Sequence, residues 1–160
     1  MEAVEKIRKH PLYIACYQRV EEAESERIFC RHQITHLLDT ARIAYIRNLE
    51  DHLNIDKAII YAAAFLHDLG KYRQYADGTP HEEAGAEIAA EILNDIDDFT
   101  EKEKQEIIQA VQEHRRIKEG MSVLGRLLCE SDKLSRACYA CPAEAQCNWS
   151  EDKKNMHVKL

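Results

Sequence analysis

Apolar side chains recur along most of the chain at the three- and four-residue spacing of an amphipathic α-helix. The segment 2–26 reads as one or two helices, depending on whether Pro11 breaks it. The segment 29–53 is apolar on two sides, and 57–69 has almost no polar surface, so both belong near the centre of a bundle. The predicted helices are 2–26, 29–53, 57–69, 81–95, 100–116 and 122–136.

Capping and turn residues mark the ends of these helices. Asp56 is the expected N-cap of the third helix, and Gly70 is expected to end it. Thr100 with Glu103 forms the sequence pattern of a capping box. The segment 71–80 contains the turn pair Asp77-Gly78, so we predict a loop there. The expected fold class is therefore all-α, a helical bundle with a Cys-rich C-terminal tail.

Imidazoles and carboxylates interrupt the apolar faces of these helices. A lone histidine on such a face is usually a satisfied core residue. An ionised carboxylate away from water costs several kcal/mol unless it is paired or binds a metal. Five helices that each point such a group inward therefore indicate a shared centre. The interrupting residues are His36, which lies on the second apolar side of its helix, His67, Asp68, His81, His114 and Asp132.

A centre of imidazoles and carboxylates suits a divalent metal. The nitrogen and oxygen ligands favour Fe, Mn, Zn, Ni or Co, and no thiolate is required. Helical bundles commonly build metal sites from side chains on facing helices. We therefore expect one or two divalent ions as the cofactor.

Three segments in order, HLLDTARIA, FLHDLGK and ESDKLSR, resemble the H…HD…D signature of the HD-domain metal-dependent phosphohydrolases over about residues 28–136. With His81 and His114, the order H…HD…H…H…D is similar to the two-metal subgroup, which includes bacterial hydrolases of dinucleoside polyphosphates. His32, four residues before His36, competes for the first ligand position, but His36 is in register with the family segment.

The resemblance implies an all-helical fold and a role for each matching residue. His36, His67, Asp68 and Asp132 would hold the first metal. Asp68 would bridge to a second metal held by His81 and His114.

The expected reaction is attack of metal-bound hydroxide on phosphorus, which also requires cations for the phosphoryl oxygens. Lys71 resembles the family lysine of HDxxK, and Lys133 resembles the lysine after the last Asp. Asp68, Lys71 and Lys133 are the expected catalytic residues. Each cation can also be read as an ordinary solvated side chain. The expected substrate-binding residues are Lys71, Lys133, Arg136 and Arg115.

Cys138, Cys141 and Cys147 form a C-x2-C-x5-C pattern in the tail. The CxxC spacing lets two thiolates reach one metal, so a structural Zn or an iron–sulfur cluster is one reading. Free thiols and a redox pair are the others. A fourth ligand would come from elsewhere in the chain: Cys129, Cys30, Cys16 or His157.

The amino-acid composition limits the kinds of ligand and partner that the protein is expected to bind. The 160 residues include 22 basic and 29 acidic ones, for a net charge of −7, which argues for a small nucleotide or phosphoester rather than a long nucleic acid. No apolar run reaches the roughly 20 residues of a membrane helix, and the N-terminus has no signal-peptide core. We expect a cytoplasmic protein that does not bind membranes; a homodimer stays open. The expected division is N-terminal helices 1–27, HD domain 28–136 and Cys-rich tail 137–160.

Two other functions stay open beside the phosphohydrolase. One is a non-catalytic sensor of a nucleotide or metal. The other is a di-iron oxygenase, because some HD proteins with the additional histidines use a pair of iron ions to cleave C–C or C–P bonds.

Overall fold

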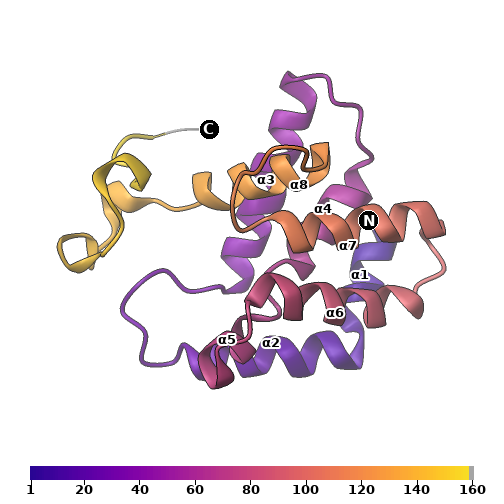
Figure 1. Ribbon diagram of the computed structural model, residues 1–160, viewed down its shortest axis with the longest axis horizontal. Coiled ribbons are helices and arrows are strands. Elements are labelled where there is room, and N and C mark those ends of the chain that lie inside the picture. The colour runs from indigo at the N-terminus through magenta and orange to yellow at the C-terminus, as the bar shows by residue number, and fades with distance from the viewer. Residues whose placement is uncertain (159–160) are drawn as a thin grey trace.

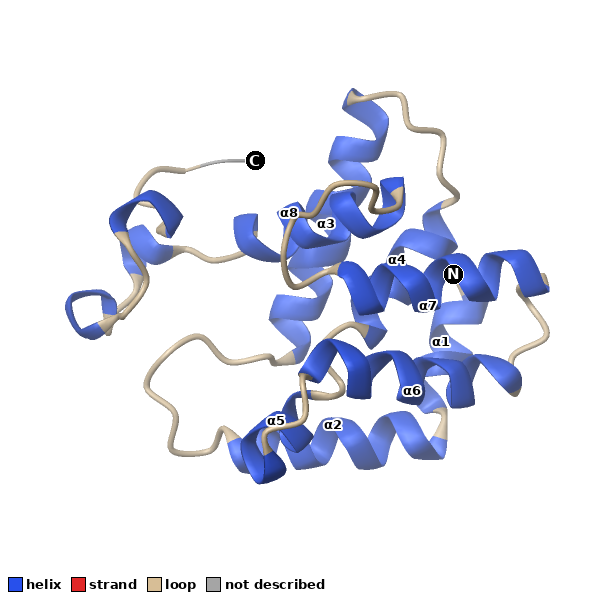
Figure 2. Cartoon of the chain, viewed as in Figure 1, coloured by secondary structure: helices blue, strands red, loops and turns tan. Residues whose placement is uncertain are grey.

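The computed structural model describes residues 1–158, which form helices and short 3-10 turns without a strand (Figure 2). The all-α prediction is confirmed. The helices are α1 (Glu2–Lys9), α2 (Pro11–Ala23), α3 (Ile34–Glu50), α4 (Lys57–Leu66), α5 (Lys71–Asp77), α6 (His81–Asn94), α7 (Glu101–Glu113) and α8 (Val123–Leu134), followed by the 3-10 turns η1 (Cys138–Ala140), η2 (Glu144–Gln146) and η3 (Glu151–Lys153).

The predicted N-caps are in place, but Gly70 does not end the third helix. Helix α4 already ends at Leu66, and Gly70, with φ −78°, is the residue before α5. Pro11 separates α1 from α2, and the His10 ring between them accepts a hydrogen bond from Leu12 N at 3.2 Å. Asp56 caps α4 by accepting from Ala58 N at 2.7 Å. Thr100 and Glu103 form both hydrogen bonds of the capping box that opens α7. The polar capping residues of the sequence therefore determine where these helices begin.

Helix α4 lies at the centre of the bundle (Figure 1). Its Ala62, Ala63 and Ala64 have no exposed surface, and the helix contacts α1, α3, α7 and α8. Small side chains let neighbouring helices approach α4 from several sides. The chain turns directly after α4, so the residues that follow Leu66 emerge in the interior of the molecule.

The loop predicted for 71–80 is wrong over most of its length, because Lys71–Asp77 forms α5, which packs on α2 and α6. The turn pair Asp77-Gly78 is real but acts as the end of this short helix, with Gly78 in the left-handed region at φ 83°. Tyr72 packs against the core from α5. Tertiary packing thus makes a helix from a segment with no capping signal at its start.

The predicted helix over 29–53 is shorter in the structure, where α3 begins at Ile34. The residues before it are extended because Glu24, at the end of α2, holds them. Its carboxylate accepts a hydrogen bond from His32 N at 2.7 Å and another from the His32 ring. A side chain thus replaces the helical hydrogen bonds of this segment.

None of the described helices combines the length and the apolar content that a membrane-crossing helix requires.

Gly70 allows the turn after α4 to press against α6. A Cβ at this position would overlap the carbonyl oxygen of His81 and lie 2.5 Å from Gly85 N. Backbone atoms cannot move aside as a side-chain tip can, so this contact requires glycine. It brings the start of α6, and with it His81, against the turn that carries Asp68.

We predict that Gly70→Ala lowers the free energy of unfolding by about 2–3 kcal/mol, the usual cost of overpacking a filled interior. Gly120→Ala is the comparison, because its Cβ meets nothing within 4 Å and only its φ of 75° opposes the change. That variant should lose about 1 kcal/mol. Urea denaturation of both variants measures the two costs, and equal losses would contradict a steric role for Gly70.

Candidate metal centre

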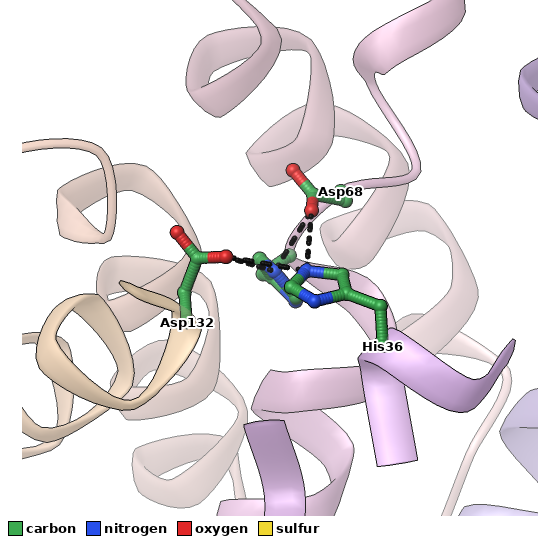
Figure 3. Close-up of side chains that lie close together, drawn as sticks. His36, Asp68 and Asp132 are labelled. Carbon is green, nitrogen blue, oxygen red and sulfur yellow. Dashed lines mark hydrogen bonds and ion pairs between the residues drawn. The ribbon is translucent and has the colours of Figure 1, made fainter. Parts of the chain in front are cut away.

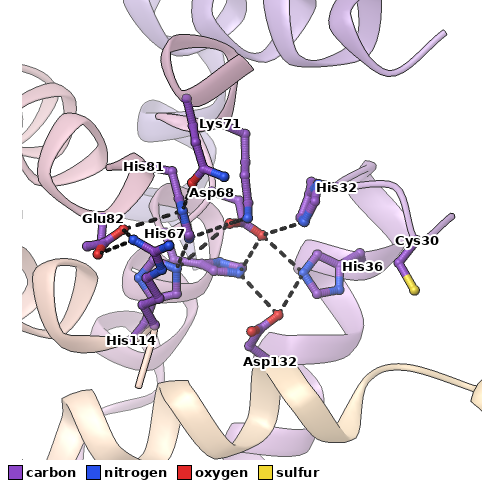
Figure 4. A network of polar contacts seen from close by, with 12 residues as sticks. Cys30, His32, His36, His67, Asp68, Lys71, His81, Glu82, His114 and Asp132 are labelled. Carbon is purple, nitrogen blue, oxygen red and sulfur yellow. Dashed lines mark hydrogen bonds and ion pairs between the residues drawn. The ribbon is translucent and has the colours of Figure 1, made fainter. Parts of the chain in front are cut away.

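Six buried or half-buried side chains from five parts of the fold converge on one point (Figure 4). Helix α3 contributes one, the turn after α4 two, the first residue of α6 one, the C-cap of α7 one and the last turns of α8 one. The structure thus brings together all six residues predicted to hold the divalent ions of the His and Asp centre. They are His36, His67, Asp68, His81, His114 and Asp132.

The first group consists of His36, His67, Asp68 and Asp132, whose ligand atoms all lie within 4.8 Å of one another. Nε2 of His36 is 3.2 Å from Asp68 Oδ2 and 3.2 Å from Asp132 Oδ1 (Figure 3). Nε2 of His67 is 2.9 Å from Asp68 Oδ2 and 3.8 Å from Asp132 Oδ1. Two imidazoles and two carboxylates therefore face a common point.

The second group consists of Asp68, His81 and His114. Nε2 of His81 lies 3.2 Å from Nε2 of His114, and the two are 3.7 Å and 3.8 Å from Asp68 Oδ1. Asp68 therefore offers Oδ2 to the first group and Oδ1 to the second. One carboxylate belongs to both groups.

Backbone carbonyls fix the tautomers of two of these rings. Nδ1 of His67 donates to Ala64 O at 2.6 Å, and Nδ1 of His114 donates to Val111 O at 2.5 Å. A carbonyl can only accept, so the ring proton of each neutral imidazole sits on Nδ1. Nε2 then carries a lone pair, which points into the cluster.

Side chains fix the other two rings in the same way. Nδ1 of His81 donates to Gln74 Oε1 at 2.5 Å. Nδ1 of His36 lies 2.9 Å from Ser135 Oγ, whose own proton goes to Asp132 O at 2.6 Å, so Ser135 must accept from the ring. Partners of this kind orient metal-binding histidines in proteins. All four rings therefore direct Nε2 lone pairs at carboxylate oxygens or at one another.

This arrangement fits a divalent cation. Imidazole nitrogens and carboxylates gathered at these distances attract positive charge, and they form a donor set that divalent metals prefer. Nε2 of His67 is fully buried and has no hydrogen-bond partner among the described residues. Burial alone would lower the pKa of His67, but the Asp68 and Asp132 carboxylates outweigh it and raise the pKa to about 10. The same field that holds a proton there would hold a metal ion.

His32 also faces the cluster, with Nε2 3.8 Å from Asp68 Oδ2. Its Nδ1 is bound to Glu24, which also accepts from the Tyr75 hydroxyl at 2.7 Å. His36 contacts both carboxylates of the first group, whereas His32 contacts only Asp68. The register that favoured His36 agrees with this geometry. Glu24 and Tyr75 were missed because no spacing in the sequence connects them to His32.

The predicted cations line the cavity in front of the cluster. Nζ of Lys71 is 3.9 Å from Asp68 Oδ1. Nη2 of the half-buried Arg136 is 3.1 Å from both His36 Nε2 and Asp132 Oδ1. Both positive groups therefore lie in direct reach of anything bound at the cluster.

The other two cations have partners of their own. Nη1 of Arg115 donates to Glu82 Oε1 at 2.9 Å. Nζ of Lys133 bonds Arg115 O at 3.3 Å and the carbonyl and sulfur of Cys129 at 3.0 Å each. Both side chains line the cavity with their charges already paired or solvated by the protein.

The cavity has a volume of about 450 Å³. Its lining includes Asp68, His81, His114 and Asp132 of the cluster together with Lys71 and Arg136. The tail cysteines Cys138, Cys141 and Cys147 line the same cavity. This volume suits a small-molecule ligand.

A family model described as the HD domain matches residues 34–137. The chain belongs to the HD-domain family. The match spans the segment that carries all six clustered residues, so the predicted resemblance is confirmed. The HD fold also appears in the crystal structure of a predicted HD superfamily hydrolase from an uncultured Thermotogales bacterium. That structure is 24% identical with a TM-score of 0.63, over 89% of this chain and 81% of that one.

Two sequence relatives of this HD-domain chain differ in how much of their length it covers. An uncharacterized protein of Clostridium beijerinckii is 42% identical over 146 residues, which is 91% of each protein. Ribonuclease Y of Enterococcus faecalis is 28% identical over 123 residues, which is 77% of this chain but 22% of that protein. Similarity to the ribonuclease is thus confined to a small part of its length.

We predict that Mn²⁺ at about 100 times its dissociation constant raises the free energy of unfolding by about 2.7 kcal/mol, because it binds only the folded chain. Asp68→Asn, which removes the carboxylate shared by both groups, should abolish this shift. Thermal and urea denaturation with and without the metal measure it. An equal shift in the variant would contradict metal binding at this cluster.

Proposed function

We propose that this HD-domain protein is a metal-dependent phosphohydrolase that acts on a nucleotide or another small phosphoester. The observation that carries the proposal is the shared carboxylate. Asp68 lies between two sets of imidazoles, each with Nε2 lone pairs directed inward by hydrogen bonds at Nδ1. Such a donor set suits two adjacent divalent ions.

Each residue has a proposed role. His36, His67 and Asp132 would hold one ion, His81 and His114 would hold the other, and Asp68 would contribute to both. The donors are nitrogen and oxygen, so Fe, Mn, Zn, Ni and Co remain the candidates. When bound, such ions supply a hydroxide nucleophile at neutral pH and neutralise charge that builds on phosphoryl oxygens.

Lys71 and Arg136 are proposed to bind the non-bridging oxygens of the substrate. Phosphoryl transfer requires fixed positive charge at these oxygens, and a guanidinium can grip two of them. The Lys71 ammonium and the Arg136 guanidinium lie beside Asp68 and Asp132, where the phosphorus would sit. For Lys133 or Arg115 to take part, their present hydrogen bonds must first break.

His32 is proposed to carry a proton at the edge of the centre. Glu24 holds its Nδ1, which leaves Nε2 directed at the cavity that the substrate would enter. A histidine oriented by a carboxylate in this way can accept a proton from water or donate one to a leaving group. This role requires no change in the position of the ring.

Several observations support a small phosphoester as substrate. The cavity of about 450 Å³ suits a small molecule, and the net charge of −7 disfavours binding along a nucleic-acid backbone. The Thermotogales neighbour is described as a hydrolase, and the relative Ribonuclease Y is named for action on RNA. These names support hydrolysis but not the small size of the substrate, which is why an oligoribonucleotide is included in the test. The free cysteines fit a reducing compartment such as the cytoplasm.

The test is a product-release screen with the protein loaded separately with each candidate metal. The substrates are nucleotides, dinucleoside polyphosphates and a short oligoribonucleotide, with Asp68→Asn as the inactive control. We expect turnover of at least one nucleotide or dinucleotide. Tight nucleotide binding without turnover would favour a sensor, and oxygen-dependent turnover without phosphate release would favour an oxygenase.

We predict that Lys71→Ala lowers kcat/KM on the substrate found by this screen about 100-fold, the usual loss when one preorganised charge-stabilising group is removed. Lys102→Ala removes the same charge from an exposed position on α7 and should leave the rate unchanged. Steady-state kinetics of the two variants decides the question. Equal losses of kcat/KM in the two variants would mean that Lys71 acts only through the overall charge of the protein and not through a contact in the site.

A further inference from the structure

Four cysteines from two distant parts of the chain line one cavity. Cys138, Cys141 and Cys147 come from the tail, and Cys30 comes from the extended segment before α3. A smaller neighbouring cavity is also lined by Cys30, Cys138 and Cys141. Figure 4 shows Cys30 beyond His36, outside the His and Asp cluster. We propose that these four thiols form a second, separate metal site.

The structure separates Cys30 from the other candidates for the fourth ligand. Cys129 is buried in α8, where its sulfur accepts a hydrogen bond from Lys133 Nζ. Cys16 is buried in α2 beside the Tyr72 hydroxyl. His157 is exposed and lines a different cavity. Cys30 alone among these candidates shares a cavity with the tail cysteines.

Short turns position the tail cysteines. Cys138 begins η1 and Cys141 follows it, with Cys141 N bonded to Cys138 O at 3.1 Å. Cys147 follows η2 in the same way, with its N bonded to Glu144 O at 3.0 Å. All three tail cysteines line the same cavity.

The described part of the tail is held by few apolar contacts. Cys138, Ala143 and Asn155 are its buried residues, while Tyr139 and Trp149 are 49% and 36% exposed. The tail forms a lobe beside the bundle (Figure 1). A segment that buries so little apolar surface usually needs a metal or another cross-link to stay folded. The proposed site supplies one.

Positive side chains surround the thiols. Arg27, Arg136 and Lys154 line the same cavity, and Arg27 Nε donates to Cys30 O at 2.9 Å. The ligand form of cysteine is the thiolate, which cations stabilise. Four thiolates carry more negative charge than one divalent ion cancels. Lys154 already pairs with Glu144 at 2.6 Å and Arg136 with Asp132 at 3.1 Å, so Arg27, beside Cys30, is the cation that favours a thiolate here.

Four thiolates bind either a single Zn ion or an iron–sulfur cluster. Within residues 1–158, no three of the cysteine sulfurs lie within 4.8 Å of one another, whereas a tetrahedral Zn ion holds them about 3.8 Å apart. Zinc would therefore draw the tail and the Cys30 segment together. A cluster, whose ligands bind different iron atoms, would bridge a wider spacing.

The experiment separates this site from the His and Asp centre by using the Asp68→Asn background. Protein purified without oxygen is analysed for zinc, iron and acid-labile sulfide, and its visible absorption is recorded. We expect either one zinc per chain, or iron with equivalent sulfide and charge-transfer absorption. Either result supports the four-thiolate site and identifies its metal.

Cys30→Ser, added to this background, should remove that metal and speed proteolysis of the tail. Cys16→Ala is the matched control and should change neither. A background protein with neither zinc nor sulfide would overturn the proposal. So would a Cys30→Ser variant that keeps its metal and its resistance to protease. Neither result depends on phosphohydrolase activity.

Discussion

The buried carboxylate of Asp68 is the constraint around which the rest of the site is arranged. Removing an ionised carboxylate from water costs several kcal/mol. The helices around it supply imidazoles whose second nitrogens are committed to Ala64 O, Val111 O and other acceptors, so their lone pairs add to its negative field. The protein therefore gathers two carboxylates and several imidazole nitrogens at one interior point, beside the Arg136 guanidinium and the Lys71 ammonium. A divalent cation bound there would meet both carboxylates.

The scaffold can meet this cost because α4 is apolar on every side. The alanines of α4 pack against the surrounding helices. This packing holds the turn that carries His67 and Asp68 in place in the interior of the protein. Gly70 then lets α6 approach closely enough for His81 to reach Asp68. Packing of the smallest side chains thus determines the geometry of the most polar ones.

The sequence predicted the parts of the site that depend on local periodicity. His67, His81, His114 and Asp132 interrupt helical apolar faces, so their convergence follows once those faces pack together. The helix at 71–77 and the contact of Glu24 with His32 could not be predicted in this way. Both depend on partners distant in sequence, and neither changes the apolar pattern of its own segment.

The short stretch from Asp132 to Cys138 connects the cluster to the tail. The Arg136 guanidinium contacts Asp132 and His36, while its carbonyl accepts a hydrogen bond from the buried Asn155 at 3.0 Å. The same Asn155 side chain donates to Lys133 O at 2.6 Å. The buried amide of Asn155 thus joins the tail to the backbone at Lys133 and Arg136. The segment that carries Asp132 and Arg136 is therefore held from both sides, by the packing of α8 and by the tail.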